Sequence, residues 1–169
     1  MRNVKADFRR YRRIHGLVHT LFDQSWWAIL EFRIGHWVRK GERVPFRPVL
    51  QVMTLLTRKV IEVGAGISIS PVATIGPGFH IAHFGGIFIN SDAVIGSDCS
   101  ISQGVTIGND PSGGVPVLGD RVSVYPGATM FGAITIGDDA KIGAGAVVLN
   151  DVPPGATAVG PKARVVERR

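Results

Sequence analysis

The sequence predicts a mainly β protein in which a short α-helical N-terminal segment precedes a parallel β-helix, a solenoid of short strands. Three observations lead to this prediction. Aliphatic residues recur every six positions after residue 68. Of the 22 glycines, 3 lie before position 60 and 19 after it. In the first 60 positions, apolar residues recur instead at three and four residues, as in helices that bury one stripe.

The N-terminal segment, residues 1–64, is expected to form about three short helices. Two apolar stripes have helical spacing, namely Phe8, Tyr11, Ile14, Val18 and Leu21, and then Trp27, Leu30, Ile34, Trp37 and Val38. The segment RVPFRP interrupts the pattern, and Pro48 suits the first turn of a third helix. That helix should stop near Gly64 and Gly66, because glycine commonly ends helices.

Residues 65–169 are expected to form the β-helix domain and a C-terminal tail. Thirteen hexads align on an aliphatic first residue, and they start at Ile69, Ile75, Ile81, Ile89, Ile95, Ile101, Ile107, Leu118, Val124, Met130, Ile136, Ile142 and Val148. The fifth position is mostly small or β-branched. A period of six matches neither strand alternation nor an α-helix. Three hexads would make one triangular coil, with positions one and five in the interior.

Charge is unevenly placed along the chain. Residues 1–60 have a net charge of +9 and residues 61–169 a net charge of −3, which together give the total of +6. A basic segment beside tryptophans would suit peripheral contact with an anionic membrane surface, although a solvated helix face explains it equally. No nucleic-acid partner is expected.

The longest N-terminal apolar run, PVLQVMTLLT, is too short to span a bilayer, and the first residues lack the apolar core of a secretory signal. A cytoplasmic location is therefore expected.

Residues 66–166 resemble the left-handed β-helix hexapeptide acyltransferases, within them the serine acetyltransferase branch. The motifs that carry the resemblance are ISPVATIGPGFHIAHFGG, AVIGSDCSISQGVTIGN, ITIGDDAKIGAGAVVLNDVPPGA and VGPKARVV. The segments IFIN, GVTIGN and VGPKARV, with the short helical N-terminus, are most similar to exopolysaccharide acetyltransferases of the colanic-acid type. The resemblance implies direct transfer of acetyl from acetyl-CoA to a hydroxyl, in a homotrimer with active sites between subunits.

His83 is the candidate general base. A hydroxyl must lose its proton as it attacks a thioester, and an imidazole that titrates near neutrality suits that task. His83 matches the family histidine, and it is the third residue of its hexad, outside the core positions; a buried core histidine is the alternative.

His80 is expected to be structural. A metal site needs three or four ligands, and the hexads contain only these two histidines, so no metal is expected. Cys99, at a fifth position, should be a core filler.

The resemblance also assigns the remaining site residues. Backbone N–H groups of Gly108 and Asn109 would receive the oxyanion. The loop NDPSGGVPV would close over the cleft, although its composition equally suits a passive loop. Residues expected to bind coenzyme A are Gly127, Ala128, Lys141, Gly143, Ala144, Lys162 and Arg164.

The acceptor site departs from the serine acetyltransferase pattern. That family has aspartates where this chain has Ala82 and Ser68, and an Arg-His pair where it has Gly114 and Val115. Because a serine zwitterion needs charged partners, these differences favour a sugar hydroxyl of an exopolysaccharide or its precursor as acceptor. Phe84, Phe88 and Asn90 would offer it aromatic and neutral polar contacts. Serine O-acetylation for cysteine synthesis and a non-catalytic scaffold are the alternatives.

Overall fold

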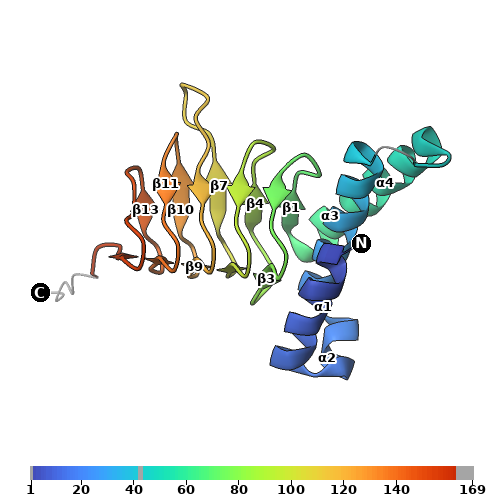
Figure 1. Ribbon diagram of the computed structural model, residues 1–169, viewed down its shortest axis with the longest axis horizontal. Helices are drawn as coiled ribbons and strands as arrows, with labels where there is room; N and C mark the ends of the chain where they lie inside the picture. The colour runs from blue at the N-terminus through green and yellow to red at the C-terminus, as the bar shows by residue number, and fades with distance from the viewer. Residues whose placement is uncertain (1, 42–43, 163–169) are drawn as a thin grey trace, which may run out of the picture.

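The computed structural model describes residues 2–41 and 44–162, and it consists of a helical segment at one end of a solenoid (Figure 1). The helices are α1 (Arg2–His15), α2 (Leu17–Phe22), α3 (Gln24–Lys40) and α4 (Arg47–Ala65). The strands are β1 (Ile67–Ile69), β2 (Thr74–Ile75), β3 (His80–Ile81), β4 (Ile87–Ile89), β5 (Val94–Ile95), β6 (Ser100–Ile101), β7 (Thr106–Gly108), β8 (Val117–Leu118), β9 (Ser123–Val124), β10 (Thr129–Phe131), β11 (Thr135–Ile136), β12 (Lys141–Ile142), β13 (Val147–Val148) and β14 (Thr157–Ala158).

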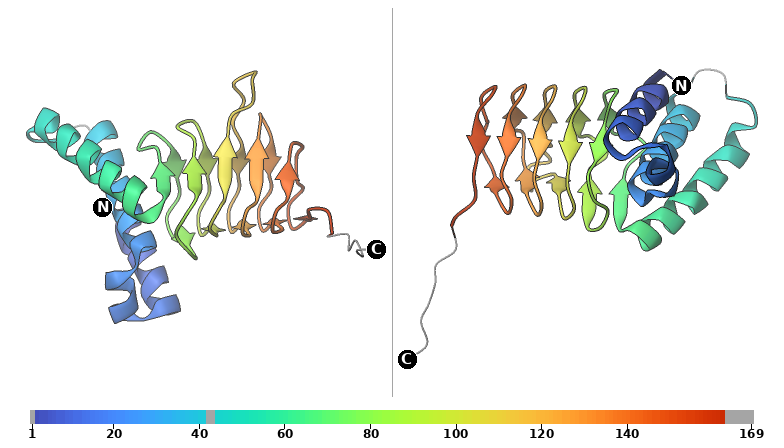
Figure 2. Two further views of the ribbon diagram at one scale, coloured as in Figure 1. Left: turned by 180° about the vertical axis from the view of Figure 1, so that it is seen from behind. Right: turned by 90° about the horizontal axis from the view of Figure 1, so that it is seen from below.

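The strands form three parallel sheets, one for each side of a triangular prism. Figure 2 shows the coils stacked along the solenoid axis. Sheet I is β1-β4-β7-β10-β13, sheet II is β2-β5-β8-β11, and sheet III is β3-β6-β9-β12-β14. From β1 to β13, successive strands along the chain belong to successive sheets, so three strands complete one coil. The predicted fold class, a mainly β, left-handed parallel β-helix with N-terminal helices, is confirmed.

The interior of the prism is filled as the hexads predict. The first residue of every hexad is buried, and most fifth residues, such as Ala73, Val105 and Ala140, are fully buried as well. Cys99 is 1% exposed in such a position, and burial raises the pKa of its thiol to about 11. It is therefore the buried core filler that the sequence predicts, since only the thiolate is a strong nucleophile.

The helical segment differs from its prediction. There are four helices among the described residues, because Gly16, with a φ of 78°, separates α1 from α2, and Asp23 separates α2 from α3. The predicted stripes are only partly buried in the single chain. Tyr11 lies in the core, but Val18 is 68% exposed, and α3 buries Trp26 and exposes Trp27.

The helices close the open end of the solenoid. β2 and β3 are edge strands, and their exposed backbone groups need partners. The Tyr11 hydroxyl on α1 donates to the Ile81 carbonyl and accepts the Ile81 N–H, at 3.0 and 2.9 Å. Arg33 on α3 donates to the carbonyls of Ile75 and Gly76, each at 2.6 Å. These side chains fix α1 and α3 against the first coil, where His83 lies.

No helix among the residues that the structure describes is long and apolar enough to cross a membrane.

Candidate active site

His83 lies on the edge of the prism that joins sheet III to sheet I, in the turn between β3 and β4. We call this edge, made of residues 82–86, 102–105, 125–128 and 143–146, the base edge. His80 and Ile81 pair with Ser100 and Ile101 in the next coil, so the turns of successive coils stack in register. The His83 side chain is exposed, as predicted from its third position in the hexad.

A pocket of about 310 Å³ contains His83 and opens between the first coil and the helices. Its lining residues are His15, His19, Phe22, Asp23, Gln24, Ser25, Ala82, His83 and Phe84. Phe84, predicted to contact the acceptor, thus lies in the same pocket as the predicted base. The opposite wall comes from α1, α2 and the start of α3, which no sequence motif placed there.

His80 is structural, and it holds the pocket wall in place. Its Nε2 lies 3.0 Å from Nε2 of His15, and the two rings stack with centroids 5.3 Å apart. Burial is the main cause that lowers the pKa of His80 to about 4, and the nearby charges of Arg10 and His15 act in the same direction. His80 is therefore neutral near pH 7, and it links α1 to the strand that precedes His83.

Several residues predicted to bind coenzyme A lie on the base edge as well. Ile101 pairs with Val124, and Val124 with Ile142, so Gly127 and Ala144 follow His83 along this edge in later coils. Backbone hydrogen bonds from Gly104 to Gly85, from Gly127 to Gln103 and from Gly145 to Pro126 join the turns. Ala128 is fully buried and presents no surface to a ligand. Lys141 and Lys162 are exposed, and Arg164 lies outside the described residues.

The remaining predicted residues lie on or next to another edge, which joins sheet I to sheet II. Asn90 and Asn109 stack in adjacent coils there, and the Asn90 side-chain amide donates to Oδ1 of Asn109 at 3.1 Å. Gly108 is buried, and a Cβ atom in its place would collide with the ring of Phe131. Phe88 lies on sheet I between the edges and is 46% exposed. One side of the prism, about 13 Å at the strand rise per residue, separates this edge from the base edge.

Two residues of the candidate site escaped the sequence analysis. Gln103 is in register with His83 one coil later, and its Oε1 is buried with no hydrogen-bond partner in the described part of the chain. Its third position in its hexad could have identified it. Asp23 faces the His83 pocket from the helices, and nothing in its sequence context signals that position.

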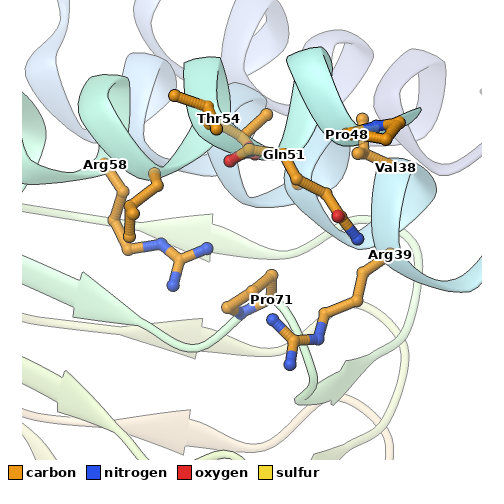
Figure 3. Close-up of a pocket in the computed structure, with 10 residues that line it drawn as sticks. Val38, Arg39, Pro48, Gln51, Thr54, Arg58 and Pro71 are labelled. Carbon is orange, nitrogen blue, oxygen red and sulfur yellow. Dashed lines mark hydrogen bonds between the residues drawn. The ribbon is translucent and has the colours of Figure 1, made fainter. Parts of the chain in front are cut away.

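A larger cavity, of about 580 Å³, lies between α3, α4 and the turn at Pro71 (Figure 3). Arg39 and Arg58 reach toward Pro71 from the two helices. None of the residues predicted for the site lines it. Within residues 2–41 and 44–162, no cluster of three or more metal-ligating side chains is present either.

The sequence is similar to curated serine acetyltransferases along most of its length. It is 41% identical over 144 residues to the serine acetyltransferase of Helicobacter pylori, covering 83% of this chain and 80% of that protein. The chain belongs to the serine acetyltransferase family. The Escherichia coli serine acetyltransferase is 38% identical over 150 residues, and the match covers 52% of that longer protein. No family model matches.

Solved serine acetyltransferases share the fold of this family member. The soybean serine acetyltransferase apoenzyme is 35% identical with a TM-score of 0.81, over 98% of this chain and 68% of that one. The Neisseria gonorrhoeae serine acetyltransferase in complex with serine is 31% identical with a TM-score of 0.80, over 97% of this chain and 68% of that one. A serine acetyltransferase solved with CoA is 34% identical, with a TM-score of 0.79, over 98% of this chain and 68% of that one.

These relatives overturn the prediction of a sugar acceptor. The serine acetyltransferase family is confirmed, and with it an acyltransferase that uses acetyl-CoA; the similarity to exopolysaccharide acetyltransferases, the carbohydrate acceptor and the role in polysaccharide synthesis have no support among them. The sugar prediction depended on four missing charged residues. It was wrong because these four positions do not include every residue around His83: helices distant in sequence also line the His83 pocket.

Proposed function

We propose that this protein transfers the acetyl group of acetyl-CoA to the hydroxyl of L-serine, with His83 as general base. The observation that carries the proposal is the 41% identity to a serine acetyltransferase across four fifths of that relative's length. The geometry is compatible with it, because His83 is exposed in a pocket and its ring has no hydrogen-bond partner among residues 2–41 and 44–162.

The proposed reaction needs one proton acceptor and no covalent enzyme intermediate. A nitrogen of the His83 ring takes the proton of the serine hydroxyl while the oxygen attacks the thioester carbonyl. As the C–S bond breaks, the thiolate of CoA leaves and receives that proton from the imidazolium. The family's partner aspartate is replaced by Ser68, whose hydroxyl hydrogen-bonds Glu62 at 3.1 Å.

The base edge is the proposed groove for the pantetheine arm of the donor. Small residues at Gly127, Gly143 and Ala144 let a thin chain approach the backbone, and Gly127 and Ala144 are exposed. The groove leads along the edge toward His83, so a thioester at its end would arrive at the base. Lys141 and Lys162 remain the proposed contacts of the CoA phosphates, by charge.

A trimer with sites between subunits would bring the two edges together. Gly108 and Asn109 lie one prism side away from His83 in one chain, so the proposed oxyanion donors would have to come from a neighbouring copy. α4 also presents an apolar stripe suited to contact between copies. It is formed by Val49, Val52, Met53, Leu56, Val60 and Val63, all more than half exposed. Val49, Leu56 and Val63 are seven residues apart, a spacing typical of helix–helix seams.

The proposal is tested by thiol release from acetyl-CoA in the presence of L-serine. The wild type should turn over serine, and His83→Ala should lose about 10²- to 10⁴-fold in kcat with unchanged CoA binding by calorimetry. His36→Gln serves as the matched histidine control, because His36 does not line the His83 pocket and its ring contacts the Pro71 carbonyl instead. The proposal fails if L-serine gives no turnover above acetyl-CoA hydrolysis, or if His83→Ala retains full activity.

A further inference from the structure

Serine is a zwitterion, and its recognition requires partners for an ammonium and a carboxylate. The positions that supply charges in the family motif hold Ala82, Ser68, Gly114 and Val115 here. A site for serine in this chain must therefore obtain its charges elsewhere. We expect these charges on the walls of the His83 pocket, because the reacting hydroxyl has to lie against the base.

Asp23 is the one carboxylate among the described residues that line this pocket. It lies at the start of α3 and is half-buried. Its Oδ1 accepts the backbone N–H of Ser25 at 2.7 Å, which caps the helix. A carboxylate has about four acceptor sites, so this one bond leaves capacity for a ligand.

The helix cap also fixes the direction of the side chain. The hydrogen bond to Ser25 holds the carboxylate at the pocket wall, and Ser25 itself is 1% exposed. Asp23 and His83 both act electrostatically on His80, the former raising its pKa and the latter lowering it, although burial lowers it most. Asp23 and His83 both line the same pocket.

We propose that the Asp23 carboxylate binds the α-ammonium of the acceptor amino acid while His83 faces its hydroxyl. The inference rests on the proposed function and assigns its acceptor specificity to a residue outside the hexads. The His19 ring and the Gln24 amide line the same wall and offer donors to the acceptor carboxylate. A pocket of about 310 Å³ has room for an acceptor of this size.

The test varies the charge of residue 23 and the ammonium of the acceptor together. Asp23→Asn removes the charge and keeps the helix cap, because asparagine caps helices as well as aspartate does. The paired acceptors are L-serine and 3-hydroxypropanoate, which has the same hydroxyl and carboxylate without the ammonium. Asp151→Asn is the matched control, since Asp151 is exposed and also accepts a backbone N–H, from Thr135 at 2.7 Å.

Asp23→Asn is expected to lower kcat/KM for L-serine about 10- to 100-fold, the size of a lost charge-assisted hydrogen bond. It should change kcat/KM for 3-hydroxypropanoate less than about twofold, and Asp151→Asn should change neither. An equal loss for both acceptors would show a merely structural role, and no loss for serine would also overturn the inference. Both results leave the proposed function standing, whereas a wild type inactive with serine removes function and inference together.

Discussion

Asp7→Ala is expected to detach the helices from the first coil. Asp7 on α1 is fully buried and Arg33 on α3 is 8% exposed. Oδ2 of Asp7 accepts from Nε of Arg33 at 2.8 Å, and its Oδ1 accepts from Nη2 at 3.3 Å and from the Phe79 backbone N–H at 2.9 Å. One carboxylate therefore joins two helices and the solenoid.

The magnitude follows from what the substitution leaves behind. Removing one partner of a buried ion pair typically costs about 3–5 kcal/mol, because the other charge stays buried without compensation. The Phe79 N–H also loses its acceptor, which by itself costs about 1–3 kcal/mol. These contributions share one site and do not add, so we expect a loss of about 4 kcal/mol in the free energy of unfolding.

The assay is urea unfolding followed by circular dichroism, at one fixed protein concentration because assembly shifts the apparent stability. Asp7→Leu combined with Arg33→Met removes both charges, and it should cost less than Asp7→Ala alone. The carbonyls of Ile75 and Gly76 lose Arg33 in that double variant, so recovery should be partial. A loss below about 1 kcal/mol for Asp7→Ala would refute the assignment of this pair as the helix anchor.

Three further outcomes are expected. Gly96→Ala should cost about 1–3 kcal/mol in urea unfolding, because its Cβ would collide with the Gly119 backbone in the next coil, whereas Gly64→Ala, with open space around it, should be neutral or stabilising. Burial raises the pKa of Glu31 from 4.5 to about 7. Stability from this group is complete below pH 4.5 and is lost as pH rises through about 7, so Glu31→Gln should flatten the fall in urea midpoint over that interval. An unchanged slope would contradict this. Leu56→Glu should reduce the mass measured by light scattering, and an unchanged mass would exclude the α4 stripe as a contact.

The solenoid could be predicted from the sequence because its period specifies burial directly. A hexad position decides whether a side chain points into the prism, and the parallel register then stacks equal positions along one edge. His83, Gly127 and Ala144 could be placed on one edge for that reason. The same logic identifies Gln103, which the sequence analysis overlooked although its hexad position equals that of His83.

The helices could not be predicted to the same depth, because a helical stripe indicates a buried face without saying what covers it. Val18 and Trp27 belong to predicted stripes and are largely exposed in the single chain, while Arg33 is buried to satisfy the open edge of the solenoid. A buried arginine between apolar neighbours has no periodic signature. Only the position of α3 over β2 shows which carbonyls it serves.

The acceptor pocket shows where motif comparison stops being informative. A family motif tests charges at fixed positions inside the repeat, and Ala82 and Ser68 fail that test. The chemical requirement, however, concerns charges in the pocket, and a helix end can deliver one from a residue 60 positions away in sequence, as Asp23 does for His83. A missing motif residue therefore becomes evidence about the substrate only after every wall of the pocket is known.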